Sequence, residues 1–113
     1  MVIREVVERA GVEPGDIGHV AFGHVIPTEK RDMYLARAAA VDAGLPVEVP
    51  AFTLNRLCGS GLQAIVSAAQ MIMVGDTDCT VAGGAECMSV VRTWRQTTAG
   101  GSGWATVSSS TRR

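Results

Sequence analysis

The feature that most constrains this chain is an apolar segment that passes through a glycine-flanked turn directly into a helical pattern. Residues 49–54 are apolar and rich in strand-forming side chains, which predicts a strand. Residues 62–73 repeat apolar side chains at intervals of three and four, which predicts a helix that is apolar on one face over about three turns. Cys58 lies between them, with Gly59 and Gly61 beside it. A fold built on this junction holds a thiol at the N-terminus of a helix.

The position of Cys58 favours a nucleophilic role. The unpaired N–H groups of a helix N-terminus carry a partial positive charge of about half an electron, which stabilises a thiolate. The thiolate is the form of cysteine that attacks carbonyl carbons. The flanking glycines leave room for a substrate carbonyl to approach. A single cysteine is more often a buried structural residue, but the glycine-flanked turn favours the nucleophile here.

The other segments alternate between helical and strand patterns. Helical patterns fall at residues 2–10 and 33–43. Strand patterns fall at residues 19–25 and 79–82. Together with the junction, this order predicts an α/β fold with a mainly parallel sheet, right-handed crossovers and helices on both faces. The site is expected at the carboxyl ends of the strands, where Cys58 falls.

Composition limits the kind of protein and its partners. The 113 residues have room for one domain, and 47% hydrophobic against 19% charged residues suits a packed core. The net charge of −1 gives no reason to expect a nucleic acid or an anionic membrane as partner. No apolar run approaches the roughly 18 residues of a membrane span, and the first residues lack a signal-peptide layout. We therefore expect a cytoplasmic protein with no membrane partner.

The remaining reactive side chains point to no second centre. Cys79 lies in a strand pattern and is interpreted as core, and Cys87 falls in a loop, so neither forms a CxxC pair or a disulfide framework. His19 and His24 are interpreted as satisfied strand or loop histidines, and they show no spacing that would hold a metal ion. Glu86 is interpreted either as a residue that orients active-site backbone or as one that closes a turn.

The segment around the cysteine carries a resemblance to a known family. Residues 55–64 read Asn-Arg-Leu-Cys-Gly-Ser-Gly-Leu-Gln-Ala, which resembles the nucleophile segment of thiolases, the acetyl-CoA acetyltransferases and 3-ketoacyl-CoA thiolases. Three further stretches are similar to flanking thiolase segments in order and spacing: residues 36–46, residues 75–76 with 81–84, and Glu86 with Met88-Ser89. The resemblance covers residues 1–89 and implies a thiolase-like fold, present here as an incomplete N-terminal half.

The resemblance implies a function for the junction. Cys58 would accept the acyl group of an acyl-CoA as a thioester, for Claisen condensation or for thiolysis of a 3-ketoacyl-CoA. Coenzyme A enters as part of the substrate, and no other cofactor is expected. Thiolases take a second cysteine and a histidine from their C-terminal half, so this chain is expected to be inactive alone. A fragment would also expose apolar surface on the helix after Cys58, so we expect a homo-oligomer.

Two other functions stay open. A ketoacyl synthase-type condensing enzyme shares a cysteine at such a junction, although Asn55-Arg56 before Cys58 and the Gly-Ser-Gly after it fit thiolases better. A non-catalytic remnant or interaction fragment is the other alternative. The sequence fixes neither the length of the acyl chain nor the degradative or biosynthetic direction.

The end of the chain departs from the thiolase pattern. We interpret residues 1–89 as a partial thiolase domain and residues 90–113 as a divergent tail, of low complexity and poorly ordered from about Thr97. A reading-frame shift near Ser89 is our hypothesis for this change. Sequencing the coding DNA tests it, because a shifted frame without thiolase sequence downstream would contradict it.

Overall fold

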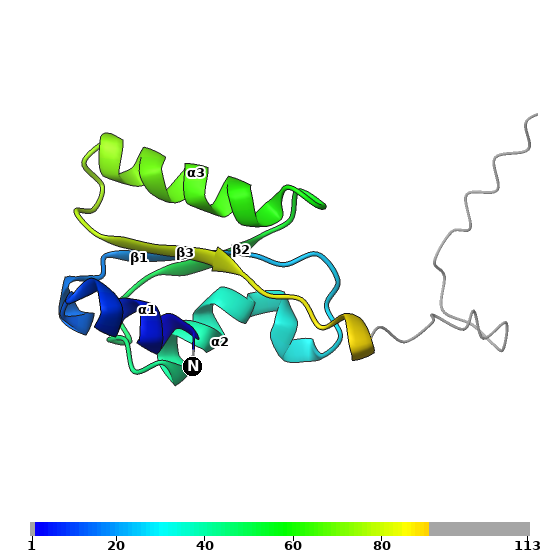
Figure 1. The fold of residues 1–113 in the computed structure, drawn as a ribbon. Helices are drawn as coiled ribbons and strands as arrows, with labels where there is room; N and C mark the ends of the chain where they lie inside the picture. The colour runs from blue at the N-terminus through cyan, green and yellow to red at the C-terminus, as the bar shows by residue number, and fades with distance from the viewer. Residues whose placement is uncertain (1, 91–113) are drawn as a thin grey trace, which may run out of the picture.

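The computed structural model describes residues 2–90 of the chain (Figure 1). Its helices and strands alternate along the sequence in the order α1 Val2–Ala10, β1 His19–Gly23, α2 Leu35–Asp42, β2 Ala51–Leu54, α3 Ser60–Met73 and β3 Thr80–Gly84. Three short 3₁₀ turns add Pro14–Asp16, Lys30–Tyr34 and Met88–Val90.

The three strands form one parallel sheet in the order β2-β1-β3. Val20 in the central strand pairs with Ala51 of β2 and with Val81 of β3. Helix α3 covers one face of the sheet, and α1 and α2 cover the other (Figure 1). The predicted α/β fold with a parallel sheet between helices is therefore confirmed.

The helices end where the sequence places their ends. Helix α1 has an apolar stripe and buries Ile3 and Val7 against the sheet, and it stops one residue before Gly11. Helix α2 stops shortly before Gly44. Gly11 and Gly44 have φ angles of +64° and +89°, which lie in the left-handed region that glycine adopts at helix ends.

The core lies between the sheet and the pair α1 and α2. It consists of Ile3, Val7, Ile17, Val20, Phe22, Ala36, Ala40, Leu45, Val49 and Val81. Burial of these side chains is the main term that stabilises the fold.

Helix α3 packs on the opposite face of the sheet through small side chains. Its buried residues are Ser60, Ala64 and Ala68, which let the helix approach the strands closely. Its large apolar side chains lie on the other side and are 42–83% exposed: Leu62, Ile65, Val66, Ile72 and Met73. The expected exposure of apolar surface on this helix is confirmed.

Several boundaries differ from the sequence prediction, among them the start of β2 at Ala51 and both ends of β3. For two others the structure shows a polar cause. Strand β1 ends at Gly23 because the N–H of Val25 donates to the Glu86 carboxylate at 2.7 Å instead of continuing the ladder. The helix predicted from Met33 begins at Leu35 and follows a 3₁₀ turn, in which the Asp32 carboxylate accepts backbone hydrogen bonds.

No helix between residues 2 and 90 combines the length and the apolar character that crossing a bilayer requires. The predicted tail lies, apart from Val90, outside the described residues. Its order and its origin in a frame shift therefore stay predictions.

Candidate active site

Cys58 lies in the turn between β2 and α3, at the carboxyl end of the sheet. It is exposed, carries a free thiol and directly precedes Gly59, the N-cap residue of α3. The structure thus places this residue at the predicted strand-to-helix junction. Cys79 is half-buried against the core, as expected, and Cys87 is exposed beyond β3.

Leu57 gives the turn its unusual backbone. Its φ of +49° makes it the only non-glycine residue with a positive φ among residues 2–90. This conformation costs about 1–2 kcal/mol for an L-residue, so other contacts must hold it. The Oδ1 of Asn55 accepts from the Leu57 N–H at 2.9 Å. The Ser60 hydroxyl donates to the Leu57 carbonyl at 2.6 Å and accepts from the Arg56 N–H at 2.8 Å. Side chains before and after Cys58 therefore fix its backbone.

The end of β1 touches the start of α3. A Cβ on Gly23 would lie 2.5 Å from the carbonyl carbon of Ser60 and 2.7 Å from the backbone nitrogen of Gly61. Only glycine fits this approach, because both contacts are to backbone atoms. Immediately after β1, the Val25 carbonyl accepts from the Asn55 Nδ2 at 3.2 Å. The central strand and the cysteine turn are thus in direct contact.

A pocket of about 480 Å³ opens beside Cys58 at this end of the sheet. Its walls come from three separate segments, which are Gly23 to Ile26, the turn from Leu57 to Gly61, and Glu86 with Met88. Sequence reasoning identified Cys58 but did not place His24 here. The available signal was its position immediately after a predicted strand, where α/β proteins gather their functional residues.

His24 is buried in the wall of this pocket, with a side chain that is 5% exposed. Its Nδ1 lies 2.6 Å from the Ala85 carbonyl oxygen and 2.9 Å from Glu86 Oε1. Both neighbours are acceptors, so Nδ1 carries the hydrogen. Its Nε2 is buried without a hydrogen-bond partner in the described part of the chain and lies 3.9 Å from Asp32 Oδ2. The prediction of a satisfied histidine is therefore right for one nitrogen only.

Backbone N–H groups hold both neighbouring carboxylates in their charged form. The N–H of Val25 is the main cause that lowers the pKa of Glu86, with smaller contributions from Ile26 and His24. The N–H groups of Thr28 and Glu29 lower the pKa of Asp32. His24 therefore lies between two carboxylates that are each anchored to a loop.

His19 and Arg37 lie away from the cysteine turn. His19 begins β1 at the opposite end of the strand and packs edge-on against Phe52, with ring centroids 5.4 Å apart. The guanidinium of Arg37 donates to the Val47 and Val49 carbonyls, which fixes the segment before β2. Within residues 2–90, no group of three or more His, Cys, Asp or Glu side chains is arranged to hold a metal ion.

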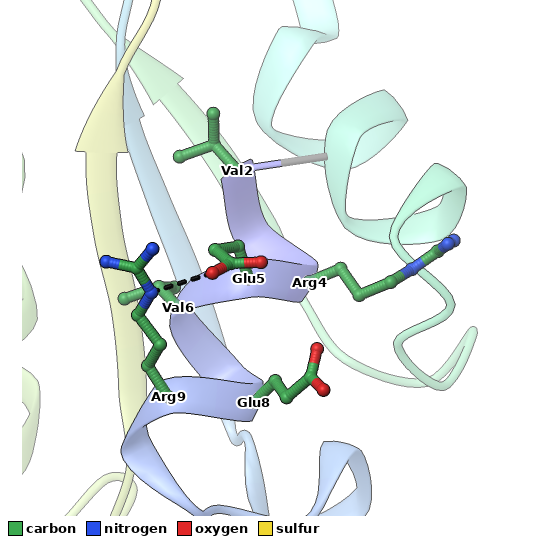
Figure 2. Close-up of a pocket in the computed structure, with 6 residues that line it drawn as sticks. All are labelled: Val2, Arg4, Glu5, Val6, Glu8 and Arg9. Carbon is green, nitrogen blue, oxygen red and sulfur yellow. Dashed lines mark hydrogen bonds and ion pairs between the residues drawn. The ribbon is translucent and has the colours of Figure 1, made fainter.

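A second pocket, of about 510 Å³, lies along α1. All its lining residues come from that helix: Val2, Arg4, Glu5, Val6, Glu8 and Arg9. Figure 2 shows Arg4 and Glu8 pointing to one side of α1, while Arg9 reaches back to pair with Glu5 at 2.7 Å. This open surface contains no nucleophile and no residue of the cysteine turn, so we place the candidate site at Cys58.

Comparisons with known proteins agree with the geometry. The family model described as "Thiolase, N-terminal domain" matches residues 1–109. Beta-ketothiolase BktB of Cupriavidus necator is 63% identical over 89 residues, which cover 79% of this chain and 23% of that protein. An acetyl-CoA acetyltransferase of the same organism is 49% identical over 89 residues, which cover 79% of this chain and 22% of that protein.

A solved structure shows the same fold. The crystal structure of the Bacillus anthracis acetyl-CoA acetyltransferase matches with a TM-score of 0.76 and 40% identity, over 89% of this chain and 27% of that chain. The chain therefore spans about a quarter of the length of the proteins it matches. Family model, sequence identity and fold agree, and the chain belongs to the thiolase family, of which it represents part of the N-terminal domain.

Proposed function

We propose that Cys58 accepts the acyl group of an acyl-CoA as a thioester. The observation that carries this proposal is an exposed free thiol in a strained turn, directly before α3 and beside a pocket. In the proposed step the Cys58 sulfur attacks the thioester carbonyl and forms a new C–S bond. The bond from that carbon to the coenzyme A sulfur breaks, and coenzyme A leaves as a thiol with the proton from Cys58.

We infer that the chain by itself stops at this acyl-enzyme. Claisen condensation and thiolysis also need a base that moves the α-proton and a site that stabilises the negative oxygen. The chain spans about a quarter of its relatives, and no part of it resembles the later thiolase motif that holds the catalytic histidine. Condensation and thiolysis thus belong to a longer thiolase. A non-catalytic remnant or interaction fragment is the alternative, in which Cys58 accepts no acyl group.

The intact mass of the purified chain after incubation with acetyl-CoA tests the proposal. We expect one acetyl group on the wild-type chain, released by hydroxylamine, and none on Cys58→Ala. Cys87→Ala is the matched control, because Cys87 is also exposed and free but lies outside the turn. An adduct that persists in Cys58→Ala would contradict the proposal. A chain that is folded by circular dichroism but forms no adduct would support the remnant.

We also propose that the chain forms a homo-oligomer through α3. The exposed face of this helix is apolar, and Ser60–Met73 contains no charged residue, so two copies can approach without charge repulsion. Multi-angle light scattering of the purified chain measures this directly. A monomer at all concentrations would contradict the proposal. The cytoplasmic location expected from the sequence stays a prediction.

A further inference from the structure

We propose that Glu86 is a positioning residue for Cys58, which it controls through the backbone of Val25 and the side chain of Asn55. This inference rests on the proposed role of Cys58 as the acyl acceptor. The sequence leaves open whether Glu86 orients active-site backbone or closes a turn, and it names neither the residue that Glu86 acts on nor the path to Cys58. Two contacts carry the inference. One joins Val25 to Glu86, 61 residues later, and the other joins Val25 to Asn55, at the start of the cysteine turn.

The first contact ties two loops together. On the side of β3, the last backbone hydrogen bond to β1 runs from the N–H of Ala85, the residue after β3, to the Gly23 carbonyl, at 3.1 Å. Beyond that point the Glu86 Oε1 accepts from the N–H groups of Val25 at 2.7 Å and Ile26 at 3.3 Å. The carboxylate thus replaces the backbone acceptors of a strand for these N–H groups and fixes the start of the loop after β1.

His24 holds this carboxylate in place. Its Nδ1 lies 2.9 Å from Glu86 Oε1 in a buried ring, so Glu86 would lose this contact if its side chain turned away. On the other side the ring faces Asp32, whose Oδ2 accepts from the Thr28 N–H at 2.7 Å and the Glu29 N–H at 2.9 Å. The imidazole therefore connects two anchored carboxylates.

The second contact carries the position of Val25 to the cysteine turn. The N–H of Val25 donates to Glu86, while its carbonyl accepts from the Asn55 Nδ2 at 3.2 Å. The other end of the same amide, Asn55 Oδ1, accepts from the Leu57 N–H at 2.9 Å. Leu57 is the strained residue directly before Cys58. A displaced Val25 would therefore displace the amide that holds the strained peptide, and with it the thiol.

The test compares two reactions of Cys58 in the full chain. Iodoacetamide is small and reports the amount and access of thiolate. A pantetheine disulfide is long, and its exchange with Cys58 requires the thiol to face the pocket correctly. Peptide mapping follows each cysteine separately. Loss of the Glu86 charge changes the amount of thiolate and therefore affects both rates. The rate of disulfide exchange divided by the rate of alkylation cancels this effect and reports the position of the sulfur.

We expect Glu86→Ala to lower this ratio by about tenfold, which is less than the roughly hundredfold that a 1 Å displacement of a reacting group can cost. Glu86→Gln keeps an acceptor for the Val25 N–H and is expected to stay close to the wild-type ratio. Glu8→Ala removes an exposed carboxylate from α1 and is the matched control. An unchanged ratio in Glu86→Ala would overturn the proposal, and so would an equal loss in Glu8→Ala.

Asn55→Ala tests the same proposal at the contact between Val25 and the cysteine turn. It leaves the Glu86 carboxylate in place and breaks the next contact, so it is expected to lower the ratio by a similar factor. Should Glu86→Ala fail to fold, an unchanged ratio in Asn55→Ala overturns the proposal by itself. In the double variant we expect no further loss, because both residues act on one path, whereas multiplied losses would show independent effects. A wild-type chain that exchanges with the disulfide but is not acetylated by acetyl-CoA would refute the acyl-acceptor role alone.

Discussion

Gly23→Ala tests whether the contact between β1 and α3 sets the position of the cysteine turn. The new Cβ would lie 2.5 Å from the Ser60 carbonyl carbon, 2.7 Å from the Gly61 nitrogen and 2.8 Å from the Ser60 Cβ. Ordinary contacts begin at 3.4 Å, so the start of α3 must move by roughly 0.9 Å. Two of the three atoms are backbone, and a rotamer change cannot relieve the overlap.

The expected loss of stability is about 2 kcal/mol, within the range of about 1–3 kcal/mol found for overpacked sites. In urea unfolding followed by circular dichroism, this loss lowers the midpoint by about 1–2 M at a slope of about 1–2 kcal/mol/M. The rate of Cys58 alkylation is expected to change as well, because the turn moves with α3.

Gly15→Ala and Gly61→Ala are the matched controls. An added Cβ meets nothing within 4 Å at either position, and neither glycine has a positive φ. Both variants are expected to unfold at or above the wild-type midpoint. Equal midpoints for Gly23→Ala and Gly15→Ala would refute the steric argument and, with it, the close contact between β1 and the turn.

Three further predictions concern acid stability, the turn and the exposed helix. The pKa values of Glu86 and Asp32 are lowered in the folded chain, so the unfolded chain binds more protons just below their ordinary values of 4.5 and 3.8. The stability that these groups contribute is therefore present above about pH 4.5 and is lost as the pH falls through the folded pKa values. Urea midpoints measured between pH 7 and pH 3 should show this loss, and the loss should be smaller in Glu86→Gln. Ser60→Ala removes both hydrogen bonds of the Ser60 hydroxyl, in a residue that is 4% exposed, and takes away the acceptor of the Arg56 N–H, while the Leu57 carbonyl keeps its bond from the Ser60 N–H at 3.0 Å. This loss should cost about 1–3 kcal/mol in urea unfolding, and an unchanged midpoint would speak against this account of the turn. Ile65→Gln on the outer face of α3 should shift the chain toward monomer in light scattering, while Val2→Gln, on an exposed valine of α1, should not; equal shifts would mean that α3 is not the interface.

Much of the fold could be predicted because its signals are local. The apolar spacing of residues 2–10 and the glycine at position 11 are enough to predict α1 and its end. The strand before Cys58 and the helix after it could be predicted from apolar runs of different period. The parallel sheet follows from the order of these elements, because strands that alternate with helices pair in parallel.

The parts that sequence could not supply depend on contacts between distant residues. The periodicity of α3 marks an apolar face, but it does not say that Ala64 and Ala68 would meet the sheet while Ile65 faces outward. The early end of β1 depends on a carboxylate about 60 residues away. His24 enters the Cys58 pocket only because β1 and the cysteine turn come together in space. No local pattern records these pairings.

The pairing of β1 with both other strands also determines when the pocket forms during folding. Val20 pairs with Ala51 and with Val81, at sequence separations of about 30 and about 60 residues, and long separations raise the entropy cost of closing the chain. The segment that carries Glu86 is the last of the three pocket walls along the sequence, and its contact with Val25 spans the longest loop. The wall of the pocket that Glu86 and Met88 supply is therefore the last to form, and the thiol of Cys58, which is exposed in the folded chain as well, has no complete pocket beside it until this loop closes.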